Sequence, residues 1–305
     1  MNAEARIRPL GQPVDRLLAA YAVIGAAALL FPHRTPSWPW LLLLHGVAVT
    51  FGFGLVPARN AWLALARLMP RMAGLLHDWY PVALIPFLYA ELPPLNLAVW
   101  NGRYFDTVII PVEQALFHGQ PSREWAAAMP LLPLSEMLHA FYLSYYLIIC
   151  APPLFIYLSA TRDEFRRAVF ALLLTFVVHY LFFIWLPVQG PRYLFPAPDG
   201  VISRGAVYNL THRILEAGSS RGAAFPSSHV GVAVAQTITA WRYCRRLSPV
   251  LAILAVGLAC GAVYGGFHYA TDALAGAGLG AAAALFAPAL YRRLARPDTR
   301  SADAR

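Results

Sequence analysis

The sequence contains no lysine, so all 24 of its basic residues are arginine, and guanidinium groups alone carry the net charge of +9. Without lysine, the chain can form no lysine Schiff base and no lysine clamp for phosphate. Only 13% of the residues are charged, whereas 59% are hydrophobic, and the mean hydropathy is +0.53. This composition indicates a polytopic membrane protein rather than a soluble globular one.

Cysteine is also scarce. Cys150, Cys244 and Cys260 each lie in or beside an apolar segment, and their spacing does not match that of a metal site. We therefore expect three free, buried thiols.

Long apolar segments, in contrast, are abundant. A helix that crosses a bilayer requires about 20 mostly apolar residues, and eight segments approach that length. They are residues 15–32, 39–57, 79–99, 134–158, 165–187, 227–243, 248–265 and 270–291. The sequence therefore predicts an all-α membrane helix bundle with about eight transmembrane helices.

Arginine placement predicts the orientation of the bundle, because cytoplasmic loops retain an excess of positive charge. With the N-terminus inside and eight spans, most arginines fall in inside segments, which favours membrane orientation over binding to nucleic acid. Several of the remaining arginines lie in one long outer loop, residues 188–226. We expect an integral protein of a bacterial cytoplasmic membrane, with both termini in the cytoplasm and this loop on the extracytoplasmic face.

Four regions follow from these segments. Residues 1–100 form an N-terminal transmembrane region of about three spans, with an amphipathic surface helix over residues 60–77. Residues 101–133 form an interfacial helix and turn on the outer face. Residues 134–295 form the transmembrane core, and residues 296–305 form a tail.

Two polar motifs lie at the mouths of apolar segments. Phe225-Pro-Ser-Ser-His229 begins one segment, and His268-Tyr-Ala-Thr-Asp272 begins another on the same face. At i,i+4 spacing on a helix, Asp272 can hold one ring nitrogen of His268 and leave the other free. Each motif alone also fits an ordinary helix start, with a serine N-cap or a capped histidine. Together they indicate a proton relay and a nucleophile suited to phosphoryl transfer.

A phosphate group would find several hydrogen-bond donors near these motifs. Ser227 and Ser228 stand at a helix start, where the backbone N–H groups favour anions. Arg192 and Arg221, in the long outer loop, carry fork-shaped guanidinium groups that suit phosphate oxygens. These four residues are the predicted phosphate ligands.

The two motifs, read as Phe225-Pro-Ser-Ser-His229 and Gly265-Gly-Phe-His268-Tyr-Ala-Thr-Asp272-Ala-Leu-Ala-Gly276, resemble the second and third signature motifs of the type-2 phosphatidic acid phosphatase superfamily. The resemblance covers roughly residues 130–290. Within the superfamily, Gln189-Gly-Pro-Arg192-Tyr and the segment from Asp106 to Ser122 are most similar to the inositol phosphorylceramide synthase branch.

This resemblance implies a six-helix core preceded by two further spans, and a phosphohistidine mechanism that requires no metal and no other cofactor. His268 would attack phosphorus, and Asp272 would orient His268. His229 would protonate the leaving oxygen and then activate the acceptor. Arg192 would stabilise charge on the phosphoryl oxygens.

The chain departs from the superfamily at its phosphate clamp. The first signature motif begins with lysine and ends in Arg-Pro, but this chain has no lysine, and Tyr193 follows Arg192. The serine–arginine pair expected before the nucleophile is replaced by Gly261-Ala262. Either Arg192 and Arg221 replace the missing ligands, or the substrate is a phosphodiester rather than a monoester. The second option agrees with the transferase branch.

The leading hypothesis is a membrane phosphotransferase that moves a phospho-headgroup, such as phosphoinositol, from a glycerophospholipid to a lipid hydroxyl. Its partners would be membrane lipids. A lipid-phosphate phosphatase that uses water as acceptor would share the same residues. Candidate ligands of the acceptor or headgroup are Asp106, Glu113, Glu136 and His139, although interfacial or packing roles explain them more simply.

Two other classes of function remain open from the residues alone. A transporter would require ionisable residues that face one another near the centres of spans. A zinc site made of His229, His268 and Asp272 would need a cluster of ligands that the neighbouring sequence does not offer. The sequence does not indicate an oligomeric state.

Overall fold

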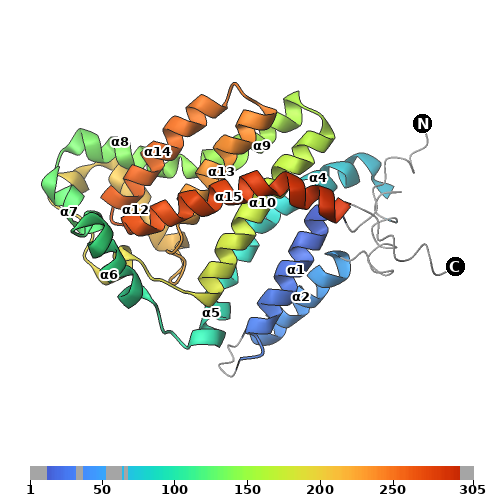
Figure 1. Ribbon diagram of the computed structural model, residues 1–305, viewed down its shortest axis with the longest axis horizontal. Helices are drawn as coiled ribbons and strands as arrows, with labels where there is room; N and C mark the ends of the chain where they lie inside the picture. The colour runs from blue at the N-terminus through green and yellow to red at the C-terminus, as the bar shows by residue number, and fades with distance from the viewer. Residues whose placement is uncertain (1–11, 32–36, 53–63, 65–67, 296–305) are drawn as a thin grey trace.

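The computed structural model describes residues 12–31, 37–52, 64 and 68–295. As predicted, the described chain is all-α (Figure 1), and its β structure is limited to an isolated bridge between Val188 and Ala223. The helices are α1 (Pro13–Ala28), α2 (Trp38–Gly52), α4 (Pro70–Ala90), α5 (Leu92–Trp100), α6 (Asp106–Phe117), α7 (Pro121–Ala128), α8 (Leu132–Leu143), α9 (Tyr145–Ser159), α10 (Arg162–Trp185), α11 (Pro191–Leu194), the short 3-10 helix η2 (Ile202–Arg204), α12 (Ala206–Gly218), α13 (Ser228–Tyr243), α14 (Ser248–Tyr264) and α15 (Ala270–Ala295).

Among the described helices, α10 and α15 are each long and apolar enough to cross a membrane. The pairs α4–α5 and α8–α9 would each add a span if they are single helices bent by 42° and 43°, and α2 and α14 are shorter apolar helices. These helices support a membrane protein, whereas the count of eight spans remains a prediction. Parts of the predicted span 39–57 and of the surface helix 60–77 lie outside the described residues, as does the tail 296–305.

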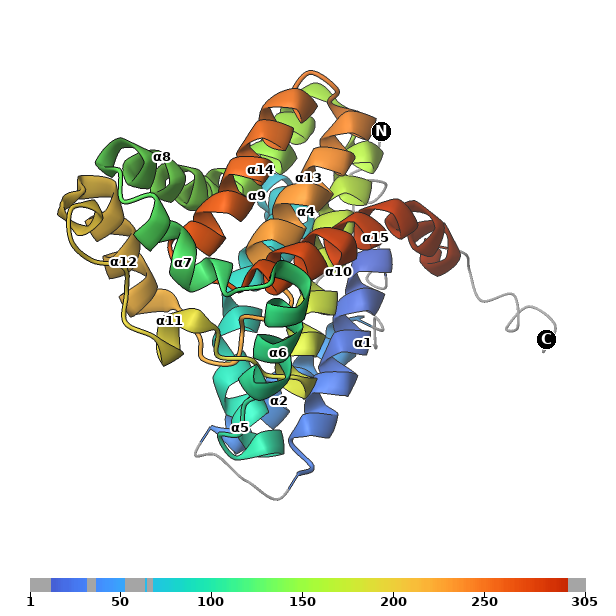
Figure 2. The ribbon, with the colours of Figure 1, turned by 60° about the vertical axis from the view of Figure 1, so that its left-hand side comes forward.

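Helix α10 lies at the centre of the bundle (Figures 1 and 2), where it contacts α1, α4, α5, α9, α13 and α15. It begins at a capping box, in which Thr161 accepts a hydrogen bond from the Glu164 N–H and the Glu164 carboxylate accepts one from the Thr161 N–H. From Phe165 onward most of its side chains are buried, as expected for a helix that is apolar all round.

Glycines allow α13 and α15 to touch along their backbones. A Cβ atom on Gly280 would lie 2.0 Å from the carbonyl oxygen of Gly231, and one on Gly276 would lie 2.2 Å from that of Ser227. No larger residue fits such a contact. The close approach brings the start of α13 beside the start of α15, where the Ser227 N–H donates to the Asp272 carbonyl oxygen. The two sequence motifs therefore meet.

Arginines gather at the other ends of these helices. Arg16 of α1 donates to the Leu294 carbonyl oxygen at the end of α15, and Arg242 near the end of α13 donates to the Ala284 carbonyl oxygen. Arg166 near the start of α10 forms an ion pair with Asp78 of α4, at 2.8 Å. The predicted orientation rests on this asymmetry of charge.

The segment predicted as an interfacial helix and turn consists of α6 and α7. Both lie with α12 at one end of the bundle, as Figures 1 and 2 show from two directions. The prediction for the cysteines is only half right: all three are free, but Cys150 is exposed, and Cys244 and Cys260 are half-buried. Cys150 lies on a face of α9 that also exposes Leu147 and Leu154, so its apolar surroundings are those of an outward-facing surface.

Candidate active site

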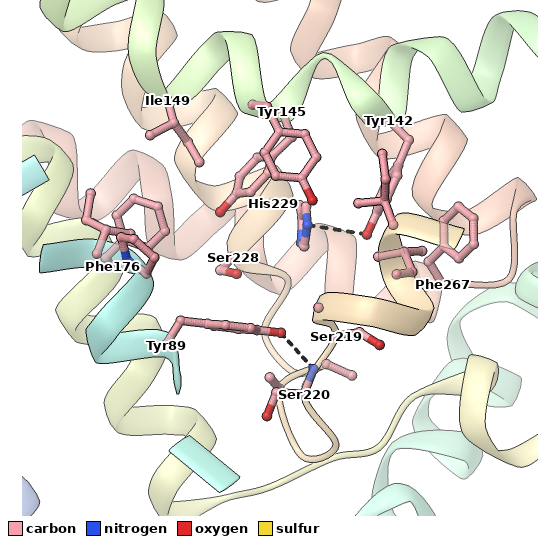
Figure 3. Close-up of a pocket in the computed structure, with 18 of the residues that line it drawn as sticks. Tyr89, Tyr142, Tyr145, Ile149, Phe176, Ser219, Ser220, Ser228, His229 and Phe267 are labelled. Carbon is pink, nitrogen blue, oxygen red and sulfur yellow. Dashed lines mark hydrogen bonds between the residues drawn. The ribbon is translucent and has the colours of Figure 1, made fainter. Parts of the chain in front are cut away.

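A cavity of about 530 Å³ lies where the two histidine motifs meet (Figure 3). Side chains of α4, α9 and α10, such as Ile85, Ile149 and Phe176, form an apolar wall. At its polar end the cavity is lined by His229 and His268, together with other residues of both motifs and of the outer loop. The structure thus brings both predicted histidines to one cavity.

His268 is buried, and the partners of its ring favour one tautomer. Its Nδ1 atom lies 3.1 Å from the Ala224 carbonyl oxygen and 3.5 Å from Oδ2 of Asp272. Both neighbours are hydrogen-bond acceptors, so the proton belongs on Nδ1, and Nε2 keeps its lone pair. Asp272 is fully buried, and its Oδ2 also accepts from the Tyr269 N–H at 2.9 Å. The predicted pairing of Asp272 with His268 therefore occurs, with the Ala224 carbonyl oxygen as a second and closer partner.

His229 lies between two tyrosine rings of the α8–α9 pair. Its ring centroid is 5.0 Å from that of Tyr142 and 4.1 Å from that of Tyr145, and it is 5.6 Å from that of His268. The Tyr142 hydroxyl lies 3.3 Å from Nε2 of His229, the contact drawn as a dashed line in Figure 3. This arrangement fixes the plane of the His229 ring beside His268.

Ser227 and Ser228 have different surroundings. The Ser227 hydroxyl caps α13 by accepting from the Val230 N–H at 3.4 Å, and Ser227 does not line the cavity. Ser228 does line it. Of the two serines predicted as phosphate ligands, Ser228 lines the cavity, whereas Ser227 caps the start of α13.

Of the two arginines predicted as phosphate ligands, one lines the cavity and the other does not. Arg192, on the short helix α11, lines the cavity together with both histidines. Arg221 is exposed, and its guanidinium carbon lies 5.1 Å from the centroid of the Tyr193 ring, outside the cavity lining. Arg192 is therefore the arginine that faces the site.

Asp106 holds the loop that carries Arg192. Its carboxylate is buried and accepts hydrogen bonds from the N–H groups of Gln189 and Gly190, each at 2.9 Å. Gly190 has a φ of +85°, and a Cβ atom there would lie 2.8 Å from the Cβ of Ala224, so only glycine suits this turn. Asp106 thus binds the backbone of the chain itself and does not line the cavity.

Glu113 likewise binds backbone N–H groups, at the start of α15. Its fully buried carboxylate accepts from the N–H groups of Ala270 and Thr271, at 2.9 and 2.8 Å, and from the Thr271 hydroxyl at 2.6 Å. A carboxylate at a helix N-terminus satisfies backbone donors and also interacts favourably with the helix dipole. Glu113 therefore fixes the turn between His268 and Asp272.

The other two candidate headgroup ligands lie around α12. Glu136 accepts from the N–H groups of Val207 and Tyr208 at the start of that helix, and the buried His139 ring packs 4.9 Å from the Tyr208 ring. Neither residue lines the cavity. Beside them, burial lowers the pKa of His212 to about 4, and the positive charges of His139 and Arg192 act in the same direction.

Sequence reasoning missed the tyrosines that surround His229. Tyr142 and Tyr145 stand at i,i+3 spacing, which places both on one side of the α8–α9 pair. Hydroxyl groups at this spacing inside an apolar segment were the available signal. Tyr89 of α4 was also missed; its hydroxyl accepts from the Ser220 N–H and so ties the outer loop to the bundle (Figure 3).

Glycine at position 261 has a structural reason. A Cβ atom there would lie 2.2 Å from the Leu138 carbonyl oxygen, because α14 packs directly against α8. The next residue, Ala262, is fully buried, and its carbonyl oxygen accepts from the N–H groups of Phe267 and His268. No phosphate ligand can project from position 261 without moving α8. Among the described residues, no group of three or more metal-ligating side chains is placed to hold a metal ion.

Comparisons with known proteins agree with the two motifs. A family model described as the PAP2 superfamily matches residues 108–286, which is more than half of the chain and includes both histidines and Arg192. No curated protein and no solved structure matches the chain. Both histidines lie within the matched residues and line one largely apolar cavity in a helical bundle. This chain therefore belongs to the PAP2 superfamily.

Proposed function

We propose that this protein is an integral-membrane phosphotransferase that moves a phospho-headgroup from a glycerophospholipid to a lipid hydroxyl through a phosphohistidine at His268. The observation that carries the proposal is the cavity itself. In this cavity His268, whose Nε2 is free to attack, has its ring centroid 5.6 Å from that of His229, and among the described residues Arg192 is the arginine that lines the cavity. A wall of apolar side chains adjoins these three residues. Membership of the superfamily supports phosphatase or phosphotransferase chemistry on lipids.

In the first half of the reaction, Nε2 of His268 attacks phosphorus and the bond from phosphorus to the glycerol oxygen breaks. The leaving diacylglycerol oxygen takes a proton from His229, and the phospho-headgroup remains on His268. In the second half, His229 removes the proton of the acceptor hydroxyl, whose oxygen attacks phosphorus and releases His268. Arg192 neutralises charge on the phosphoryl oxygens in both halves.

The reduced phosphate clamp supports a phosphodiester over a monoester as substrate. A monoester dianion carries one more negative charge than a diester, so it needs more cationic ligands. Here Arg192 is the cation that lines the cavity, Gly261 leaves no room for a side chain, and Arg221 contacts Tyr193 instead. A diester with one negative charge suits a site with one arginine.

The apolar wall supports a lipid as the substrate. It is formed by α4, α9 and α10, and it reaches Tyr146 and Cys150, which are exposed on the outer face of α9. In a membrane, exposed apolar helix faces meet acyl chains. We propose that acyl chains reach the histidines between α4 and α9, and that the site opens on the extracytoplasmic side, as the arginine distribution in the sequence predicts.

The test is product analysis with the purified protein in mixed micelles. Phosphatidylinositol and phosphatidic acid, labelled in the headgroup phosphate, are each supplied with and without ceramide, or with a diacylglycerol whose acyl chains differ in length from those of the donor. The proposal expects a new labelled phospholipid that requires both a diester donor and an acceptor. Free phosphate released from phosphatidic acid without an acceptor would instead identify a phosphatase.

Two variants serve as controls for the assay. His268→Ala removes the nucleophile and should abolish all transfer. Ser159→Ala, at the exposed end of α9 away from the site, loses only a hydrogen bond to the Phe155 carbonyl oxygen and should behave as the wild type. Formation of the same product by His268→Ala would overturn the phosphohistidine mechanism.

A further inference from the structure

Two cavities meet at Phe267, the residue directly before the proposed nucleophile. One is the largely apolar cavity that both histidines line, and the other, of about 730 Å³, lies beside α7 and α12. The second cavity, which we call the polar chamber, is lined by carboxylates such as those of Asp199 and Glu216 as well as by apolar groups. Phe267, Arg192 and Tyr193 line both cavities, so they form the partition between them.

The polar chamber is suited to hold water. Ser122 is 3% exposed, and its Oγ atom has no hydrogen-bond partner among the described residues. Nε2 of His212 is also buried and has no partner in that part of the chain. Both residues line the chamber. Buried polar groups that the protein leaves unpaired are normally bound by water, so water in the chamber would lie on the other side of the partition from the histidine cavity.

Phe267 is the buried apolar member of this partition. It is 5% exposed, whereas Arg192 and Tyr193 are half-buried and polar. A cluster of buried apolar side chains includes Phe267, Tyr142 of α8 and Leu215 of α12, so the partition extends from one helix to the next. An apolar ring in this position repels water, while the two polar residues beside it remain free to contact a substrate.

The ring of Phe267 lies between a residue of the active site and a residue of the chamber. Its centroid is 4.6 Å from that of Tyr142, beside which it is drawn in Figure 3, and 5.4 Å from that of His212. Tyr142 contacts His229, and His212 lines the polar chamber. Removing the ring would therefore join the two spaces.

The backbone fixes the ring in place. The N–H groups of Phe267 and His268 both donate to the Ala262 carbonyl oxygen, at 3.0 and 3.1 Å. The ring folds back over Gly265, where a Cβ atom would overlap it. The ring therefore cannot leave the partition unless the turn that carries His268 moves as well.

We propose that Phe267 keeps water away from the phosphohistidine, and thereby directs the phospho-headgroup to a lipid hydroxyl. The proposal rests on the transferase reaction proposed above and names a residue that sets its specificity. In the reaction that Phe267 suppresses, the water oxygen bonds to phosphorus and the bond from phosphorus to Nε2 of His268 breaks. His229 takes the proton of the water, and the headgroup leaves as a soluble phosphomonoester. Water and the acceptor hydroxyl would use the same two histidines, so access to phosphorus decides between them.

The test measures how the product divides between lipid and water. Phosphatidylinositol labelled in its phosphate is supplied with ceramide, and labelled lipid product is separated from labelled water-soluble product. Phe267→Ala removes the ring and leaves room for water, one molecule of which occupies about 30 Å³. We expect the ratio of soluble to lipid product to rise at least about tenfold. Phe267→Leu keeps a smaller apolar side chain in the partition and should raise the ratio about threefold.

Two variants serve as controls. Phe195→Ala makes the same substitution at a residue that lines the polar chamber but not the histidine cavity, so the ratio should stay within about twofold of the wild type. His268→Ala in the Phe267→Ala background should form neither product, because both arise from the phosphohistidine. Without any acceptor, the labelled phosphoenzyme should lose its label to water at least about tenfold faster in Phe267→Ala than in the wild type.

A ratio that does not change in either Phe267 variant, or that rises equally in Phe195→Ala, would overturn the role of Phe267. If Phe267→Ala does not fold, Phe267→Leu decides, because a leucine keeps most of the apolar contacts. Soluble product from the variant that lacks both Phe267 and His268 would also overturn the proposal. A wild type that releases soluble product and forms no labelled lipid would overturn the transferase reaction itself, whereas transfer with an unchanged ratio would overturn only the role of Phe267.

Discussion

Replacing Glu113 with glutamine tests whether a buried carboxylate on α6 holds the start of α15 in place. The change keeps the size of the side chain but replaces one acceptor oxygen with an NH₂ group. In the wild type, the carboxylate accepts from two backbone N–H groups and one hydroxyl, at 2.6–2.9 Å, and is fully buried. An amide nitrogen cannot accept any of these bonds.

The magnitude follows from those contacts. Thr271 can rotate its hydroxyl to accept from the new NH₂ group, but at least one backbone N–H, of Ala270 or of Thr271, loses its partner. A buried donor without a partner costs about 1–3 kcal/mol, and loss of the charge at the helix start adds about 0.5 kcal/mol. We expect Glu113→Gln to lose about 2–3 kcal/mol of stability, or about 5–10 °C in the unfolding midpoint. A shift of the turn beside His268 should also lower kcat about tenfold.

Glu164→Gln is the matched control. Glu164 also accepts from a backbone N–H and a threonine hydroxyl, both of Thr161, at 2.8 and 2.7 Å, but it does so at the solvent-exposed first turn of α10. Water can replace those bonds, so this variant should lose only about 0.5 kcal/mol. Thermal unfolding in detergent and single-turnover kinetics compare the two. If both variants unfold at the same temperature, or if Glu113→Gln turns over at the wild-type rate, then Glu113 does not position the site.

Three further substitutions test other parts of the site. His268→Ala should lower turnover at least about 1,000-fold while the protein still folds, although loss of the contacts with Ala224 and the buried Asp272 should lower its unfolding midpoint; wild-type turnover would remove the nucleophile. Tyr142→Phe should lower kcat about threefold to tenfold, because one neutral hydrogen bond to His229 is lost; an unchanged kcat would show that stacking alone holds the ring. Gly261→Ser should lower the unfolding midpoint by at least about 5 °C without creating phosphatase activity, because its Cβ atom would meet the Leu138 carbonyl oxygen at 2.2 Å; a gain in monoester hydrolysis would contradict the proposed substrate.

The histidine motifs were predictable because their function depends on residue type and spacing. Asp272 was predicted to lie beside His268 on one helix, but His268 lies two residues before α15 begins, so their contact comes from the turn in which Asp272 also accepts from the Tyr269 N–H. The all-α fold followed from apolar segment lengths in the same way. The exposure of Cys150 did not follow, because an apolar segment looks the same whether a given face meets other helices or lipid.

The separation of the predicted phosphate ligands was not predictable from local sequence. Ser227 and Ser228 are chemically identical, yet only Ser228 lines the cavity, since the other hydroxyl caps α13. Arg192 and Arg221 lie in one loop, yet the loop is folded by a bridge between Val188 and Ala223 that no periodicity indicates. The path of that loop decides which arginine faces the histidines.

The two acidic residues of α6, Asp106 and Glu113, show which contacts could be predicted from the sequence and which could not. Asp106 and Glu113 stand two helical turns apart, at i,i+7 spacing, so both lie on one face of α6. One binds the backbone before Arg192, and the other binds the backbone after His268, at partners that are distant in sequence. Backbone N–H groups carry no sequence signature, so these partners could not be foreseen. The signal that could have been used is the spacing itself, because two carboxylates on one face of an amphipathic helix must either face water or be satisfied by the protein. Here the protein satisfies both, and a single helix thereby sets the distance between the loop that carries Arg192 and the turn that carries His268.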